Sequence, residues 1–157
     1  MDEKTKPSKW EGKASRELET IKADQIWPLF EDFCTIHKWL PNINTCHHVE
    51  GVHGQPGLVR YCESSSNDII KWCHEKLISI DPVERYLSYE VKENNIGFKR
   101  YVAEQKVIEI ESGCKIEWLF VADPIEGWGL EDLCGYIESS LNSMVDRMEK
   151  VLQAATN

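Results

Sequence analysis

The feature that most constrains this chain is an apolar stripe along its last thirty residues. Between Trp128 and Gln153, large apolar side chains recur at spacings of three and four, which indicates one helix of about seven turns. The stripe consists of Leu130, Leu133, Cys134, Ile137, Leu141, Met144, Val145, Met148, Val151 and Leu152. At about 1.5 Å per residue this helix spans on the order of 40 Å. Because no other stretch predicts a helix long enough to cover it, we expect the stripe to pack on a sheet.

Most of the remaining chain alternates between apolar and polar residues, as strands with one solvated face do. We predict strands at 9–21, 44–50, 57–63, 69–80, 84–91, 100–110 and 114–122. Two short helices are expected at 23–33 and 35–40, the second stopped by Pro41. Consecutive hairpins imply an antiparallel sheet with the helices on one side. The predicted fold class is therefore α+β: a curved seven-stranded antiparallel sheet around a long C-terminal helix, with two short helices after the first strand.

Length and charge limit the classes of partner. We predict a single domain over residues 9–157, after a short disordered lead at residues 1–8. The 18 basic and 27 acidic residues leave a net charge of −9, which argues against nucleic acid or an anionic membrane surface as partner. No apolar run approaches the roughly twenty residues of a membrane span, and no signal peptide is evident. We expect a cytoplasmic monomer.

Cysteine and histidine residues invite a disulfide or metal interpretation. The six cysteines are widely spread and form no C-x-x-C motif, so we interpret them as reduced thiols. Cys46, His47, His48 and His53 lie close in sequence, but adjacent histidines in a strand point to opposite faces. We therefore predict no metal site, and without a phosphate-binding glycine motif we predict no cofactor.

Two charged residues fall on predicted inner faces, where an unpaired buried charge is costly. They are Arg60 and Glu75, and their neighbours on these faces are Leu58, Cys62, Cys73 and Leu77. One interpretation is a buried ion pair that only stabilises the strand register. The other is an acid or base, Glu75, beside a cation, Arg60, that holds a polar group of a substrate.

The register of the hairpin decides whether these two side chains meet. The predicted strands 57–63 and 69–80 are joined by a polar loop, Ser64 to Asp68. If this loop closes a simple hairpin with Glu63 opposite Asp68, Arg60 lies opposite Lys71. Lys71 and Glu75 share a face because both are odd-numbered, so Glu75 would point to the side of Arg60, four residues away along the strand. Contact would then require curvature or a bulge. A slip of one residue would place the pair on opposite faces.

Aromatic residues on the inner faces suggest a cavity wall. Tyr101 begins the alternation that continues through Ala103 and Gln105, and it is either a cavity hydroxyl or a core tyrosine. Tyr89 and Trp118 are expected to be wall or core residues. Arg16, on the drier face of the first strand, is unusual for a core position.

Short motifs along nearly the whole chain resemble a known family. They are KWEGK (9–13), HKWLP (37–41), VEG (49–51), LVRYC (58–62), WCHEKL (72–77), GFKRYVA (97–103), EWLF (117–120) and IEG (125–127). Together they resemble the helix-grip fold of the START-like and birch-pollen-allergen superfamily. Within it, the chain is similar to plant lachrymatory factor synthase and its polyketide cyclase-like relatives. The gate and latch motifs of the abscisic acid receptors of this superfamily are not present in the sequence.

The resemblance implies a cavity for a small apolar molecule and an arginine–glutamate catalytic pair at Arg60 and Glu75, with Tyr101 lining the site. In that synthase the pair rearranges a small sulfenic acid to a thial S-oxide. Lys71, Val91 and Leu141 depart from the synthase pattern. The candidate ligand-binding residues are Leu58, Cys62, Lys71, Cys73, Leu77, Tyr89, Val91, Trp118, Phe120 and Leu141.

Three function classes are compatible with these observations. The first is a small-ligand binding or carrier protein, in which the charged pair tunes the polarity of the cavity. The second is an isomerase or dehydratase that uses Glu75 to move protons and Arg60 as an anchor. The third is a protein with a closed cavity that acts through its surface. The altered pocket favours the first class, and enzyme activity is the alternative.

Overall fold

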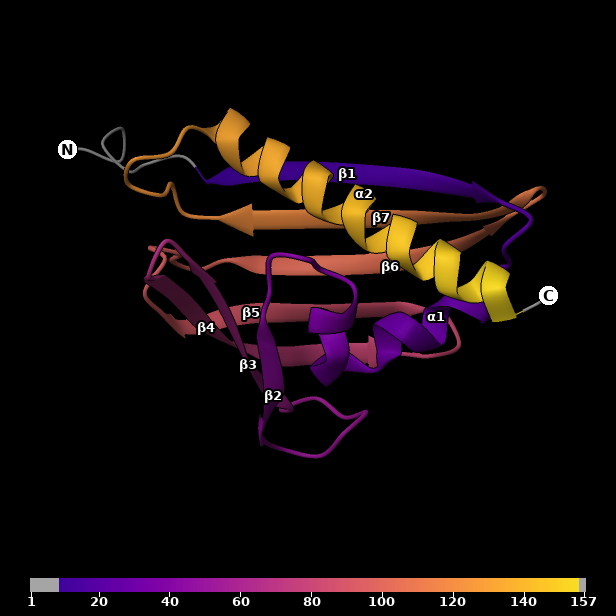
Figure 1. The fold of residues 1–157 in the computed structure, drawn as a ribbon, viewed down its shortest axis with the longest axis horizontal. Coiled ribbons are helices and arrows are strands. Elements are labelled where there is room, and N and C mark those ends of the chain that lie inside the picture. The colour runs from indigo at the N-terminus through magenta and orange to yellow at the C-terminus, as the bar shows by residue number, and fades with distance from the viewer. Residues whose placement is uncertain (1–8, 156–157) are drawn as a thin grey trace.

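The computed structural model describes residues 9–155, and the predicted order of elements is confirmed (Figure 1). The strands are β1 (Trp10–Glu19), β2 (Thr45–Glu50), β3 (Val59–Ser66), β4 (Ile69–Asp81), β5 (Tyr86–Asn94), β6 (Val102–Ile110) and β7 (Gly113–Ala122). The helices are α1 (Ala23–Glu31), the 3₁₀ helix η2 (Phe33–Lys38) and α2 (Leu130–Ala155). The strands form one antiparallel sheet in the order β1-β7-β6-β5-β4-β3-β2. The predicted disordered lead at residues 1–8 lies outside the described residues.

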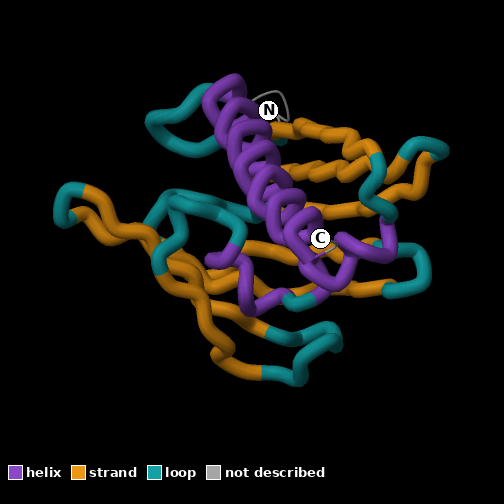
Figure 2. The backbone as a smooth tube through the Cα atoms, turned by 45° about the vertical axis from the view of Figure 1, so that its right-hand side comes forward, coloured by secondary structure: helices purple, strands orange, loops and turns teal. Residues whose placement is uncertain are grey.

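The long helix α2 crosses one face of the sheet, and α1 and η2 lie on the same side (Figures 1 and 2). The buried residues of α2 are Leu133, Ile137, Ser140, Leu141, Met144, Val145 and Met148, and all of them except Ser140 belong to the predicted stripe. Leu130 and Val151, near the two ends of the predicted stripe, are exposed. Burial of each large apolar side chain contributes about 1.5–3 kcal/mol, so this face holds the helix in place. Among residues 9–155, the structure contains no helix with the length and apolarity to span a bilayer.

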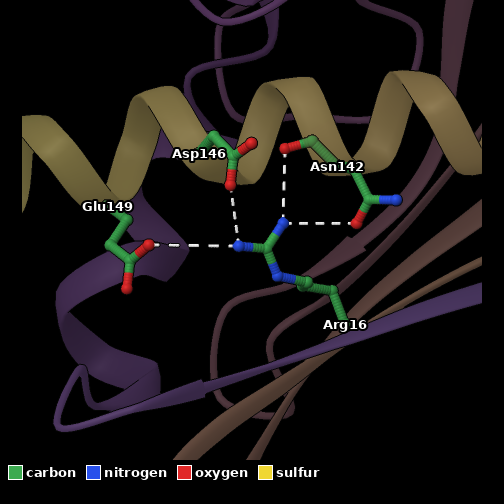
Figure 3. A network of polar contacts seen from close by, with 4 residues as sticks. All are labelled: Arg16, Asn142, Asp146 and Glu149. Atoms are coloured by element: carbon green, nitrogen blue, oxygen red, sulfur yellow. Dashed lines mark hydrogen bonds and ion pairs between the residues drawn. The ribbon is translucent and has the colours of Figure 1, made fainter.

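Arg16 ties α2 to the edge strand β1 (Figure 3). Its Nη2 lies 2.7 Å from Oδ1 of Asp146 and 4.0 Å from Oε1 of Glu149. Its Nη1 donates to Oδ1 of Asn142 at 3.2 Å and to the Asn142 carbonyl at 3.4 Å. Acceptors on the facing helix therefore explain why an arginine occupies the less polar face of β1.

The two short helices close one end of the curved sheet. Pro28 lies in the second turn of α1, and the helix ends three residues later, where the Asp32 amide donates to the Pro28 carbonyl at 3.2 Å. The chain continues directly into η2, which begins two residues before the predicted second helix. Ile26, Phe30 and Ile36 are buried, so both helices contribute to the core.

The β3–β4 hairpin corrects the predicted register. Residues 64–66 extend β3, and only Asn67 and Asp68 form the turn, with positive φ angles of 53° and 65°. Two successive residues with positive φ are typical of the type I′ turn, and asparagine and aspartate tolerate this conformation. The tighter turn moves the pairing by four residues, so Arg60 lies directly opposite Glu75.

Irregular pairing bends the sheet at the strands that carry this pair. The β4–β5 register shifts between Cys73 and Glu75 and again between Leu77 and Ser79. A further shift occurs in β2 between His48 and Glu50. Bulges increase local twist and bend a strand. In Figure 1, β2, β3 and β4 accordingly turn away from the direction of β1 and β7.

Candidate functional site

A cavity lies between the bent half of the sheet, η2 and α2. Its inner chamber, with a volume of about 80 Å³, is lined from strands β3 to β7 and from both helices. An outer vestibule of about 340 Å³ adjoins it. Residues that line both spaces are Asn42, Ser64, Lys71, Ile96, Phe98 and Tyr136. These shared residues form the junction between the chamber and the vestibule.

Arg60 and Glu75 meet on the wall of the inner chamber. The Nε of Arg60 donates to Oε1 of Glu75 at 2.8 Å, and its Nη2 lies 2.6 Å from the same oxygen. The side chains are only 5% and 14% exposed, so solvent screens the pair weakly. Both contacts use Oε1, which leaves Oε2 of Glu75 as the oxygen available to a ligand.

The remaining contacts of Arg60 hold its guanidinium in one orientation. Its Nη1 donates to the Phe33 carbonyl at 2.6 Å, and its Cζ lies 3.7 Å from the centre of the Phe33 ring and 5.1 Å from that of Tyr89. Burial is the largest single influence and lowers the pKa of the guanidinium, but Glu75 together with Cys62, Tyr89 and Cys46 outweighs burial and raises the pKa. Arg60 is therefore a permanent cation, fully engaged with protein groups.

Aromatic side chains line the chamber beside this pair and offer hydrogen-bond donors. Tyr89 and Tyr101 are both 3% exposed, with ring centres 6.4 Å apart. Burial is the main cause that raises the pKa of both phenols above the ordinary value, so both hydroxyls are neutral donors at pH 7. The indole Nε1 of Trp118 is buried and has no hydrogen-bond partner among the described residues. Such a donor can be satisfied by an acceptor on a ligand.

A row of thiols crosses the chamber wall next to Arg60. Cys62 lies opposite Cys46 in β2 and opposite Cys73 in β4. The Sγ atoms of Cys46 and Cys62 are 3.6 Å apart, and Cys62 Sγ lies 4.0 Å from Oε1 of Glu75. The pKa of Cys62 is raised well above its ordinary value, since Cys73 and burial outweigh the opposite effect of Cys46. All six cysteines are free thiols, and these three are buried.

The structure separates the candidate residues into two groups. Those on the wall of the inner chamber are Arg60, Cys62, Lys71, Cys73, Glu75, Tyr89, Tyr101 and Trp118. Those in the core, away from the chamber wall, are Leu58, Leu77, Val91, Phe120 and Leu141. The Leu77 amide donates to the Leu58 carbonyl, so these two leucines form the next row behind the ion pair. Leu141 follows Ser140 on α2, and successive residues of a helix point in different directions, so Ser140 faces the chamber and Leu141 does not.

Several chamber and vestibule residues were not singled out from the sequence. They are Ile36, Leu40, Asn42, Ile43, Glu63, Ser64, Ile96, Phe98, Gln105, Tyr136, Ile137 and Ser140 on the chamber wall, and Ser66, Asn67, Ile69 and Trp128 in the vestibule. Gln105 lies directly opposite Trp118 and is 5% exposed, so its inward position followed from strand alternation. Asn42, Ile96 and Phe98 are in connecting segments, where no periodic pattern indicates which side chains face inward.

The histidines form contacts other than metal ligation. His47 stacks on Tyr61 with ring centres 5.1 Å apart, and His48 stacks on His53 at 4.9 Å. The Nε2 of His48 also lies 2.7 Å from the Gly51 carbonyl oxygen. Within residues 9–155, no group of three or more histidine, cysteine, aspartate or glutamate side chains is arranged to hold a metal ion.

Solved structures share this arrangement of sheet and helix. XoxI from Bacillus cereus superposes with a TM-score of 0.73 at 19% sequence identity, over 96% of this chain and 99% of XoxI. Major latex-like protein 151 from Panax ginseng has a TM-score of 0.72 at 20% identity, over 90% and 97% of the two chains. Ara h 8.0201 has a TM-score of 0.71 at 15% identity, over 95% and 99%. These similarities confirm the predicted helix-grip fold.

The sequence comparison covers the same elements. Residues 9–153, from the start of β1 to the last turns of α2, match the family described as polyketide cyclase/dehydrase and lipid transport. This range includes every residue of the chamber wall and both members of the ion pair. The chain therefore belongs to the polyketide cyclase/dehydrase and lipid transport family.

Proposed function

We propose that this protein binds a small, largely apolar molecule with one polar end inside the cavity. The observation that carries this proposal is the buried Arg60–Glu75 pair on the wall of a chamber that opens into an apolar vestibule. Preformed cavities with apolar walls and a few convergent polar groups are typical ligand sites. The family supports the same conclusion, since its description includes lipid transport.

The sizes and linings of the two spaces suggest where the polar end and the apolar end of such a ligand would bind. The inner chamber is small and carries the polar groups of Glu75, Tyr101 and Trp118. The vestibule is larger, and Phe98 and Trp128 meet there with ring centres 6.5 Å apart. The polar end of the ligand therefore faces the chamber, at its junction with the vestibule or inside it, and the apolar remainder stays in the vestibule. We further propose that the protein acts as a monomer in the cytoplasm, where its thiols stay reduced.

A blocking variant tests the binding proposal. Ser140 faces the chamber from α2, and Ser140→Leu fills part of its volume, whereas the neighbouring Ser139 is exposed outside the chamber. Native mass spectrometry and thermal shift with a panel of small apolar metabolites should show ligands that wild type and Ser139→Leu bind and Ser140→Leu does not. Equal binding by a folded Ser140→Leu variant would place the ligand elsewhere.

Acid–base catalysis at Glu75 is a second candidate function. The position of Glu75 favours it, because Oε1 is held by Arg60 while Oε2 remains for a ligand, and neutral hydroxyl donors lie nearby. A carboxylate in this position can accept a proton from one atom of a substrate and return it to another, as an isomerase or dehydratase requires. A small sulfenic acid, the substrate implied by the resemblance to lachrymatory factor synthase, is one compound of suitable size.

Glu75→Gln separates catalysis from binding, because the amide keeps the shape of the side chain and loses its basicity. With an alkenyl sulfenic acid as substrate, consumption by wild type should be lost in Glu75→Gln while ligand-induced thermal shifts remain. Glu63→Gln is the matched control, since Glu63 accepts a hydrogen bond from Tyr61 at 2.6 Å instead of meeting Arg60. Unchanged consumption in a folded Glu75→Gln variant would exclude the catalytic role.

A further inference from the structure

Lys71 stands at the junction of the inner chamber and the vestibule. It lies on β4 two residues from Cys73 and four from Glu75, so all three share the inner face of the strand. Its side chain lines both spaces. No ion pair or side-chain hydrogen bond of Lys71 is formed within residues 9–155. It is therefore a cation without a counter-charge at the entrance of the chamber.

The other charged residues of the chamber lining are Arg60, Glu75 and Glu63. Arg60 is paired with Glu75, and their charges cancel. Glu63 is part of the chamber lining, but it alternates with Cys62 along β3, so its carboxylate points to the opposite face, where it accepts a hydrogen bond from Tyr61 Oη. Lys71 thus leaves the cavity one positive charge, in a chain whose net charge is −9. A positive cavity within an acidic protein favours an anionic ligand over a cationic one.

Neutral polar groups surround the same position. Ser64 is the residue paired with Lys71 across the β3–β4 hairpin, and it lines both spaces as well. Asn42 lines both spaces from the segment after η2, with its Nδ2 3.4 Å from Tyr136 Oη. A hydroxyl and an amide beside an ammonium group are suited to the several acceptor positions of a carboxylate.

We infer that the ligand is an amphipathic monocarboxylate whose carboxylate binds Lys71 at the junction and whose apolar body packs on Phe98 and Trp128. This inference rests on the proposed binding function and specifies its ligand class. Lys71 is then the residue that selects an acid over the corresponding neutral compound. A single flexible ammonium matches one carboxylate charge, and the aromatic walls match a ring or chain.

A matched pair of probes tests this selectivity. 4-Phenylbutanoate and 4-phenylbutan-1-ol share the ring and chain and differ in the terminal group. Titration calorimetry at low salt should show about twofold to fivefold tighter binding of the acid by wild type, the size of effect that an exposed ion pair produces. Lys71→Met should bind both compounds equally, and Lys71→Arg should retain the preference. The preference should decrease in about 0.5 M NaCl, where screening is stronger.

Lys76→Met is the matched control. Lys76 lies on the same strand but on its opposite, outer face, so this substitution removes the same charge outside the cavity. This variant should keep the preference for the acid. Equal binding of acid and alcohol by wild type would overturn the inference and leave the binding function in place. A preference that Lys76→Met loses as fully as Lys71→Met would also overturn it. Failure of both probes to bind would count against the proposed function itself.

Discussion

Arg16 and Arg60 are two arginines on inner faces of the sheet, and they do different things. Arg16 is 27% exposed and spreads its contacts over Asn142, Asp146 and Glu149 of α2, all reached from the edge strand β1 (Figure 3). Arg60 is 5% exposed and meets one acid, Glu75, from the adjacent strand β4. The first joins two layers of the fold, and the second lies within one layer on a cavity wall.

The surroundings explain why we propose a ligand site only at the second of these arginines. Asp146 is 57% exposed, so water and salt weaken its interaction with Arg16, and either partner alone remains solvated. Arg60 and Glu75 have little access to water, so removal of one would leave the other charge buried without compensation. A buried pair that faces empty space is poised to interact with a ligand, whereas a surface network stabilises only the packing of α2 on β1.

The largest expected effect is at the buried pair. Glu75→Leu leaves the Arg60 charge buried without a partner and should lower the free energy of unfolding by about 3–5 kcal/mol. The double variant Arg60→Met/Glu75→Leu removes both charges and should recover most of that loss. Urea unfolding followed by tryptophan fluorescence measures both values. A double variant as unstable as the single one would show that the lost stability does not come from an unpaired charge.

The surface arginine should give a smaller and salt-dependent effect. Arg16→Ala removes the contacts to Asp146 and Asn142 and should lower the free energy of unfolding by about 1 kcal/mol or less. In about 1 M NaCl this difference should shrink, because the Debye length falls to about 3 Å. The loss from Glu75→Leu should persist in the same salt. If both variants responded equally to salt, the contrast between the two arginines would fail.

The smallest expected effect is at Glu117, a carboxylate on the outer face whose side chain is largely covered by its neighbours. Its Oε2 lies 3.1 Å from Lys13 Nζ and 3.4 Å from Lys115 Nζ. Burial alone would raise its pKa, but the two ammonium groups outweigh burial and lower the pKa below its ordinary value of 4.5. Because the pKa is lower in the folded state, the carboxylate stabilises the protein above pH 4.5, and this contribution is lost as the pH falls through the lowered pKa.

Glu117→Gln should therefore lower the free energy of unfolding at pH 7 by less than about 1 kcal/mol. Unfolding curves of wild type and variant should converge as the pH falls below 4.5. Glu11→Gln is a suitable control, since Glu11 is an exposed acid of β1 with no ion pair in the described part of the chain. A difference that grew at low pH would contradict the direction of the pKa shift.

Alternation determined which residues of each strand share a face, and it was sufficient to single out Arg60 and Glu75 as charges among apolar residues on their strand faces. It did not determine how β3 and β4 pair. That depended on the turn, where Asn67 and Asp68 both adopt positive φ and shorten the predicted loop. Four polar or small residues in a row, Ser64 to Asn67, carry no signal that distinguishes strand from loop.

The cavity wall was predictable where it consists of strand residues and unpredictable elsewhere. Cys62, Cys73 and Trp118 follow strand parity, and all three line the chamber. Leu58 and Leu77 are on the same faces of their strands but lie two residues further along, next to the ion pair and away from the chamber. Alternation gives the face of a residue and not its position along the strand. Tyr136 and Ser140 line the chamber because of the rotation of α2 on the sheet, which many packed side chains decide together.

By itself, the sequence determined the elements, their order, the apolar face of α2 and the candidate charges, because periodicity and burial costs are local properties of the chain. Only the tertiary structure decided that Arg60 meets Glu75 directly, that Arg16 meets α2 and that Lys71 stands at a cavity entrance with no ion-pair partner among residues 9–155. These facts depend on distances between segments far apart in the sequence. Such distances follow from turn geometry, bulges and helix docking, which no short window of residues encodes.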